Sequence, residues 1–402
     1  MRQDVTASPA FAARAIEPRG ALLALLGGTW PPAEVAADGW PTIATMAAAH
    51  RLEPLLAWQA ERGGWPLPDA VAGAWHDARR RAALGALAQQ AALRIALAAL
   101  GEAGIAAVAL KGVALAWRHY PEAALRPMRD IDLLVPEARA IEAFAVLAAA
   151  GFVPETDDPA ILRQALVDDH QLPAQYHHAL RVTIELHHRL SDPPQRRGYR
   201  VPQIDPAGVL ARAVAVDCGG AMIACPAPQD LAAHLIVHAL YGHRLDCGPL
   251  VLADLHFLAL GHAVDWDELR NQAERDGWAR GLDLVLALVE RSFGSLPAPL
   301  AYPPPPAVMD AAEAALLLDP EARGQAEALS DFTAAQSAPA LARAVLRRLI
   351  PDPQVVAQEG GGRSLVAFWP VWVVRRLARS LRRRGPAPEV RAAAEVMRWI
   401  QA

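Results

Sequence analysis

The stretch LKGVALAWRHYPEAALRPMRDIDLLV, residues 110–135, decides the fold of this chain together with VTIELH at residues 182–187. A short apolar run, IAAVAL, ends at Lys111-Gly112 and predicts a buried strand, and the residues that follow predict a helix. The segments DIDLLV and VTIELH alternate polar with apolar side chains and predict two more strands. Strands separated by helices predict a small mixed β-sheet in an α+β unit with an α/β-type core.

Helical patterns flank this core on both sides. Apolar residues at helical spacing predict a helix over 45–60 and one long or kinked helix over 67–100. Helical patterns return after residue 230, and a proline-rich segment at 297–307 predicts an extended linker. We therefore divide the chain into four parts: an N-terminal helical region at 1–104, the sheet-containing core at 105–200, a helical substrate or acceptor region at 201–296, and the linker with a C-terminal helical region and basic tail at 297–402.

Composition and charge exclude several classes of protein. The chain has 402 residues, of which 53% are hydrophobic and 20% charged, so an intrinsically disordered chain is excluded. The formal net charge is −4, and without a basic excess no specific nucleic-acid partner is expected. Three cysteines without CxxC spacing exclude a disulfide framework and a zinc ribbon, and they predict a reducing, cytoplasmic location. Because no run of about 18 apolar residues occurs, no membrane-spanning helix is expected.

Asp130 and Asp132 stand two residues apart on a predicted strand, so their carboxylates point to the same face. Two neighbouring carboxylates repel each other unless a cation lies between them. Glu185 lies on the polar face of the strand at 182–187 and supplies a third carboxylate. Mg²⁺ prefers carboxylate and phosphate oxygens, so the three acids predict a divalent metal site, with Mn²⁺ as the other candidate ion.

Lys111 and Gly112 form the junction between the first strand and the helix that follows. Backbone N–H groups at such a junction are free to bind a phosphate, and a glycine lets the phosphate approach closely. Lys111 is the single lysine among 39 basic residues and adds a compact positive charge. Arg126 and Arg129 flank the acids and are candidates either to bind phosphate oxygens or to pair with nearby carboxylates. A phosphate loop beside three acids is the arrangement that two-metal phosphoryl or nucleotidyl transfer needs.

Residues 110–135 resemble the bacterial family of uncharacterised nucleotidyltransferases within the DNA polymerase β-like superfamily. That superfamily has a glycine motif that opens a helix, then Asp-x-Asp on a strand, then a lone acid on a later strand. The segment ELHHRL at 185–190 is similar to the strand with the lone acid, and more diffuse similarity covers roughly residues 40–295. The resemblance implies a small mixed β-sheet nucleotidyltransferase core embedded in largely helical N- and C-terminal regions.

The resemblance also implies roles for individual residues. Gly112 marks the phosphate loop, Asp130 and Asp132 bind metal ions, and Glu185 completes the catalytic site. The superfamily usually has Gly-Ser or Gly-Gly at the loop, whereas this chain has one glycine preceded by Lys111, which we expect to replace the serine contact. The expected reaction moves a nucleoside monophosphate from a nucleoside triphosphate, such as ATP, to a hydroxyl of a small molecule, peptide or protein, with release of pyrophosphate.

Histidines near the acids are candidates for an acceptor pocket. His187 shares the face of Glu185 on its strand, and His238 follows His234 by one turn on a predicted helix. Because no HExxH motif is present, we expect His187 and His238 to line the acceptor or base pocket rather than to bind a metal. A buried core position with satisfied hydrogen bonds stays open for the helical pair, and His170 is expected to lie in a loop.

The C-terminal tail differs in composition from the rest of the chain. Residues 363–402 hold nine arginines against two glutamates. The apolar segment at 365–374 is broken by Pro370 and is too short to span a membrane, and six arginines follow within 375–384. This order predicts either weak peripheral contact with an anionic membrane surface or packing on the body of the protein.

Two other functions stay open from the sequence. A catalytically inactive nucleotide-binding module would keep the fold but not the chemistry. A glycosyltransferase with a DxD motif would bind a nucleotide sugar, and it would need neither the strand–glycine–helix junction nor a third acid on a later strand. Convergence of Asp130, Asp132 and Glu185 beside Gly112 would favour nucleotidyl transfer over both.

Overall fold

The N-terminal part of the protein is helical. The computed structural model describes residues 17–30, 35–36, 38–193, 199–261, 263–294, 298–318, 369 and 388–402. The first four helices are α1 (Pro18–Leu26), α2 (Gly39–Ala49), α3 (Glu53–Gly63) and α4 (Asp69–Glu102). The long helix predicted over 67–100 is confirmed as the continuous α4.

The prediction of one helix over 45–60 is wrong. The chain turns between α2 and α3, where Arg51 adopts a positive φ of 58°. Pro54 lies in the first turn of α3. A proline there has no N–H to donate, and its ring would clash with the carbonyl of the preceding turn if α2 continued. The apolar spacing therefore runs across two helices instead of one.

A mixed five-stranded sheet forms the core, and the predicted α+β class is confirmed. Its strands lie in the order β1-β2-β5-β4-β3, with β2 parallel to β5 and all other pairs antiparallel. Their bounds are β1 (Val108–Ala109), β2 (Asp130–Leu134), β3 (Val153–Pro154), β4 (Gln175–His177) and β5 (Val182–His187). The helical segments between them are α5 (Lys111–Ala114), η1 (Leu115–His119), η2 (Ala123–Leu125), η3 (Glu137–Arg139), α6 (Ala140–Ala149) and α7 (Pro159–Asp168).

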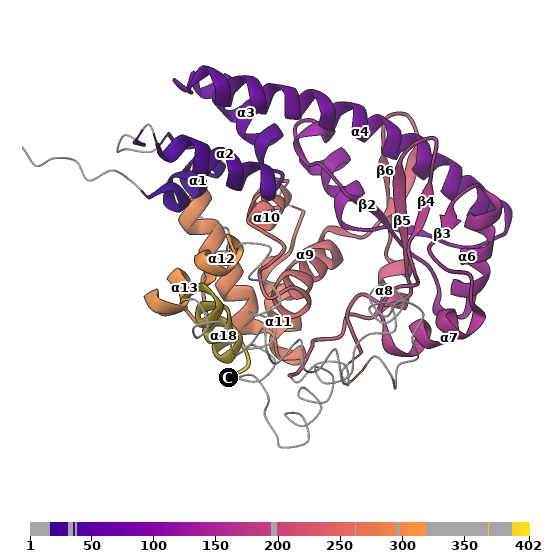
Figure 1. Ribbon diagram of the computed structural model, residues 1–402. Helices are drawn as coiled ribbons and strands as arrows, with labels where there is room; N and C mark the ends of the chain where they lie inside the picture. The colour runs from indigo at the N-terminus through magenta and orange to yellow at the C-terminus, as the bar shows by residue number, and fades with distance from the viewer. Residues whose placement is uncertain are drawn as a thin grey trace, which may run out of the picture.

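The two central strands have one apolar face and one polar face. Ile131 and Leu133 of β2, like Ile184 and Leu186 of β5, are fully or almost fully buried. Because side chains alternate along a strand, these residues share one face and the acids between them share the other. Helices α4 and α6 both contact β5, and Figure 1 shows α4 running from α3 across to the sheet.

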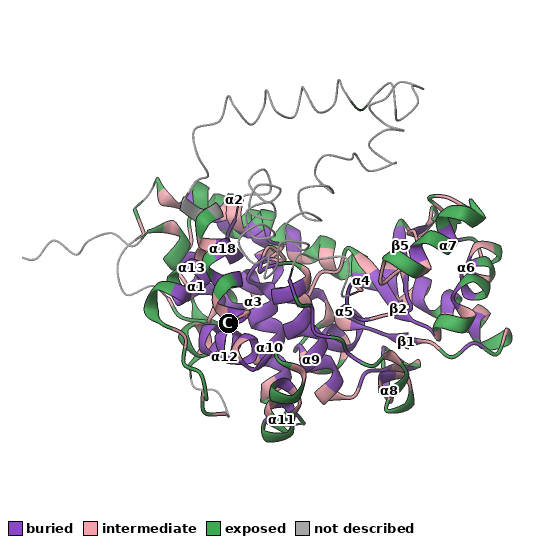
Figure 2. Cartoon of the chain, turned by 90° about the horizontal axis from the view of Figure 1, so that it is seen from below, coloured by how far each residue is buried: buried purple, intermediate pink, exposed green. Residues whose placement is uncertain are grey.

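A second group of helices lies beside the sheet (Figure 1). Its elements are α9 (Pro228–Val237), η4 (His238–Gly242), α10 (Leu250–Leu260), α11 (Trp266–Asp276), α12 (Ala279–Phe293), α13 (Pro306–Leu316) and α18 (Pro388–Ile400). Before it in the chain come α8 (Pro206–Ala211) and the hairpin of β6 (Val214–Asp217) and β7 (Met222–Cys225), which contacts β1 and η1 of the core. Helices α9 and α10 are mostly buried, whereas α7 and α11 expose much of their surface (Figure 2).

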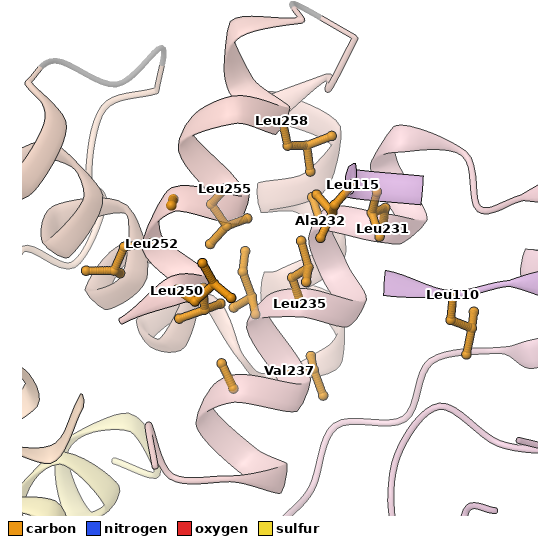
Figure 3. Close-up of a cluster of buried hydrophobic side chains, with 14 of the residues drawn as sticks. Leu110, Leu115, Leu231, Ala232, Leu235, Val237, Leu250, Leu252, Leu255 and Leu258 are labelled. Atoms are coloured by element: carbon orange, nitrogen blue, oxygen red, sulfur yellow. The ribbon is translucent and has the colours of Figure 1, made fainter. Parts of the chain in front are cut away.

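Leucines of α9 and α10 hold the segment that follows Lys111 and Gly112. Leu115 of η1 packs near Leu231 of α9 and Leu258 of α10 (Figure 3), and all three are 1% exposed or less. Burial of each such side chain contributes about 1.5–3 kcal/mol. The helices therefore fix the backbone that follows α5, and Leu110, directly before α5, is buried as well.

One described helix, α4, passes a length and hydropathy test for a membrane span, which corrects our expectation that none would. The apolar window of α4 is 33% buried, and α4 contacts α3, α6 and β5. Helices in protein cores pass the same test, so this is weak support for a span.

The predicted membrane-contacting tail at 365–384 lies outside the described residues, apart from Trp369. The division into four parts likewise stays a prediction.

Candidate functional site

The two strands that carry the predicted acids are neighbours in parallel register. Asp132 of β2 lies opposite Glu185 of β5, and Leu134 lies opposite His187. The polar face of the sheet therefore presents Asp132, Glu185 and His187 together, with Asp130 on the same face one step earlier along β2. Asp132 is 8% exposed and His187 is 1% exposed, whereas Asp130 and Glu185 are partly open.

Asp132 has two partners in this site. The Lys111 Nζ atom lies 3.4 Å from Oδ2, and His187 Nε2 lies 2.9 Å from Oδ1. Burial alone would raise the pKa of Asp132, but the positive charge of Lys111 and the contact with His187 outweigh burial and hold that pKa well below its usual range. Asp132 is therefore ionised at neutral pH.

Asp132, Glu185 and His187 fit a divalent metal ion. Each offers one ligand atom, and these atoms lie within 4.8 Å of one another. Burial, opposed by the attraction of Asp132, lowers the pKa of His187 to about 4, so the imidazole is neutral at pH 7. A neutral imidazole with two carboxylates is a donor set that Mn²⁺ and similar divalent ions accept. Because the ionised Asp132 carboxylate can only accept a hydrogen bond, the neutral His187 ring donates to it from Nε2, and the unprotonated Nδ1 atom is buried without a hydrogen-bond partner among the described residues.

The other two acids, Glu185 and Asp130, both have a raised pKa. Burial and the negative charges of Asp132 and Asp130 raise the pKa of Glu185 to about 7. Burial and Asp132 also raise the pKa of Asp130. A bound cation is most stabilising where neighbouring carboxylates repel one another and cannot all ionise at neutral pH. Asp130 lies on the same face but outside the group of three whose ligand atoms converge.

Lys111 and Gly112 lie at the start of α5, as predicted. Lys111 has a positive φ of 33°. A Cβ atom on Gly112 would lie 2.6 Å from the Met128 sulfur and 2.9 Å from an Arg126 nitrogen, so any larger residue here would displace these two side chains. This packing supplies a structural reason for Gly112, and its role as a phosphate loop stays a prediction.

The two candidate phosphate-binding arginines differ in their surroundings. Arg126 donates through Nε and Nη2 to the two carboxylate oxygens of Asp254, at 3.0 and 2.9 Å, and Tyr120 donates to the same carboxylate at 2.7 Å. This arrangement matches the carboxylate-pairing interpretation of Arg126, although the carboxylate comes from α10, far along the chain. Arg129 is exposed beside Asp130.

A cluster of histidines borders the acids. His234 of α9 is 2% exposed, and its ring centroid lies 5.7 Å from that of His238. Burial and the charge of Lys111 lower the pKa of both residues. His238 lines a cavity of about 70 Å³ together with His170 and Asp192. His170 lies in a loop, as expected, and this loop brings its ring to 5.3 Å from the His187 ring and its Nδ1 to 2.8 Å from an Asp192 oxygen.

Sequence reasoning also missed Arg51. Arg51 and Arg126 line a cavity of about 270 Å³ between the α3–α4 pair and residues 123–128. No pattern in the sequence marks Arg51 among 38 arginines, because only the fold brings the α2–α3 turn next to β2.

A family model described as "Uncharacterised nucleotidyltransferase" matches residues 36–294, more than half of the chain. The chain belongs to this family. Membership supports nucleotidyl transfer as the reaction class, and the match contains every residue of the candidate site. No curated protein sequence matches the chain.

Proposed function

We propose that this nucleotidyltransferase-family protein moves a nucleoside monophosphate from a nucleoside triphosphate to a hydroxyl acceptor and releases pyrophosphate. The observation that carries the proposal is the convergence of Asp132 and Glu185 on adjacent parallel strands, with Asp130 on the same face. Lys111 lies 3.4 Å from Asp132 and adds the positive charge that a phosphate substrate needs.

Asp132, Glu185 and His187 would hold a divalent cation, and Asp130 would supply a further carboxylate on the same face. Such a cation, when bound, supplies neutralisation of phosphate charge and polarisation of the phosphoryl group. Mg²⁺ and Mn²⁺ both accept the carboxylates, and the imidazole favours Mn²⁺.

Glu185 is the group best placed to take the proton of the acceptor hydroxyl. Without a bound cation, burial and the neighbouring acids raise its pKa to about 7, so at neutral pH this carboxylate can take up a proton or release it. The hydroxyl oxygen forms a bond to the α-phosphorus, the bond from the α-phosphorus to the bridging oxygen breaks, and pyrophosphate leaves. The hydroxyl proton goes to a Glu185 carboxylate oxygen.

The acceptor is expected on the histidine side of the acids. The cavity next to His170 and His238 has about 70 Å³ of space, enough for a hydroxyl-bearing end but not for a whole acceptor. His238 therefore keeps its predicted place in an acceptor pocket, whereas His187 is assigned to the metal group.

Transfer itself tests the proposal. Purified protein is incubated with each α-³²P-labelled triphosphate and a cell extract, and labelled products are separated. Asp132→Asn should abolish labelling, and the matched control Asp157→Asn, at an exposed position, should leave it unchanged. Binding of a triphosphate with no labelled product would instead indicate the inactive nucleotide-binding module. Transfer of a sugar from a nucleotide sugar would indicate the glycosyltransferase.

A further inference from the structure

We infer that the cavity between α3, α4 and residues 123–128 is an anion site, in which Arg51 binds a phosphate or carboxylate group of a substrate. The cavity measures about 270 Å³, which is nearly four times the space of the histidine-lined cavity. Three arginines line it, namely Arg51, Arg81 and Arg126.

Arg51 has no direct ionic partner among the described residues. Its one hydrogen bond among the described residues runs from Nη1 to the carbonyl oxygen of Pro127, at 3.5 Å, and no described carboxylate forms an ion pair with it. Burial and the charges of Arg129 and Arg126 outweigh the attraction of Asp130 and Asp254 and lower the pKa of Arg51 to about 10. A half-buried guanidinium among other cations is costly unless an anion joins it.

The backbone holds Arg51 in this position at some cost. Its φ of 58° is unfavourable for a residue with a Cβ atom, by about 1–2 kcal/mol. A strained backbone conformation persists where the surrounding structure holds the residue in one position. Such conformations are concentrated at functional sites. Here the strained turn between α2 and α3 directs an arginine to the wall of the cavity.

The other cations are already compensated. Arg126 is paired with both oxygens of Asp254, and Arg81 lies close enough to Glu53 to oppose the rise in the pKa of that acid caused by burial. Of the three arginines that line the cavity, Arg51 is therefore the one without a neighbouring carboxylate paired to it among the described residues. We expect the anionic group to bind to Arg51.

Part of the cavity wall is apolar. Small residues of α4 form it, among them Ala82, Gly85 and Ala86. A Cβ atom built on Gly85 meets nothing within 4 Å. A stretch of wall made of glycine and alanine leaves room for a flat or apolar body in the same cavity as the arginine. The ligand class is thus a molecule with an anionic group and an apolar or flat part.

The cavity adjoins the proposed reaction site. Arg126 and Met128 line it, and the same two side chains lie within 3 Å of where a Cβ of Gly112 would be. The anion therefore belongs either to the phosphate tail of the donor or to the acceptor. The choice between these sources rests on the proposed function, but the existence of the anion site does not.

The first experiment measures binding of tripolyphosphate to the full chain by calorimetry without divalent ions. Arg51→Gln should weaken binding at least tenfold, and Arg163→Gln, an exposed arginine on α7, should leave it unchanged. A second pair tests the cavity without changing charge. Gly85→Met should block binding, and Gly73→Met, equally unhindered on the same helix, should not. Equal affinity in the wild type, Arg51→Gln and Gly85→Met would overturn the inference.

The second experiment identifies the source of the anion. If Arg51→Gln weakens ATP but not AMP, the site takes the donor phosphate tail. If Arg51→Gln leaves ATP unchanged, while tripolyphosphate still binds to the ATP-saturated wild type and not to the variant, the site takes an acceptor anion. Either result supports the site. If the wild type shows no transfer activity but still binds tripolyphosphate through Arg51, the proposed function fails and this inference stands.

Discussion

Asp132 makes the central contacts of the candidate site. It contacts Lys111 on one oxygen and His187 on the other, so both carboxylate oxygens are engaged by groups that favour its ionised form. A divalent ion bound there would compete with Lys111 and replace the contact with His187. The metal affinity of the protein should therefore report directly on these three side chains.

The imidazole of His187 should set which ion binds best. Because a nitrogen ligand favours Mn²⁺ over Mg²⁺, we expect the wild type to bind Mn²⁺ more tightly, and His187→Gln to narrow the difference. Calorimetric titration of both variants with both ions measures this. An unchanged ratio of the two affinities in His187→Gln would show that His187 is not a ligand.

Metal affinity should also depend on pH through Glu185. The pKa of Glu185 is raised to about 7, so its proton must leave before a metal ion can bind. The affinity for Mn²⁺ should be nearly constant above pH 8 and should fall below pH 7, approaching roughly tenfold per pH unit. Titrations at pH 6, 7 and 8 check this, and Glu185→Gln should flatten the dependence. A wild-type affinity independent of pH would contradict the role of Glu185.

At the scale of elements, the strand β2 and the helix α5 meet at a junction where packing is tight. Gly112→Ala would place a methyl group 2.6 Å from the Met128 sulfur, so we expect a loss of about 1–3 kcal/mol in the free energy of unfolding. Gly101→Ala on α4 meets nothing within 4 Å and should gain about 0.5–1 kcal/mol. Urea denaturation compares the two variants, and equal stabilities would show that the junction is loose.

Strands β1, β2 and β5 could be predicted because their signal is local, whereas β4, β6 and β7 were not predicted. Alternation over six residues fixed Val182–His187 to the residue, and the acids of β2 and β5 were expected on one face because side chains alternate. The parallel register of Asp132 with Glu185 could not be read from the sequence, since it depends on how distant segments pair. Arg51 and His170 were missed for the same reason. The break before Pro54 was missed although proline gives a local signal for it.

At the scale of the whole molecule, one buried ion pair joins the core to the second group of helices. Arg126 lies beside β2, and Asp254 lies on α10, where its side chain is only 3% exposed. Tyr120 completes the network with a hydrogen bond to the same carboxylate. Together with the leucine cluster around Leu115, this network fixes the sheet relative to α9, from which His234 approaches Asp132.

Removing one partner of this pair should cost more than removing an exposed pair. Asp254→Ala leaves the Arg126 guanidinium buried without a counter-charge, so we expect a loss of about 3–5 kcal/mol in unfolding free energy. Arg275→Ala breaks the exposed pair with Glu268 and should cost less than about 1 kcal/mol. Urea denaturation measures both, and a small loss in Asp254→Ala would show that the pair does not join the two groups.

The central claim is that acids from two strands converge to hold a divalent cation. Binding of Mn²⁺, followed by electron paramagnetic resonance of the free ion, tests it most directly in the wild type, Asp132→Asn and Asp157→Asn. The account predicts that Asp132→Asn weakens Mn²⁺ binding by at least about tenfold while Asp157→Asn binds as the wild type does. Equal Mn²⁺ affinity in all three proteins would contradict it.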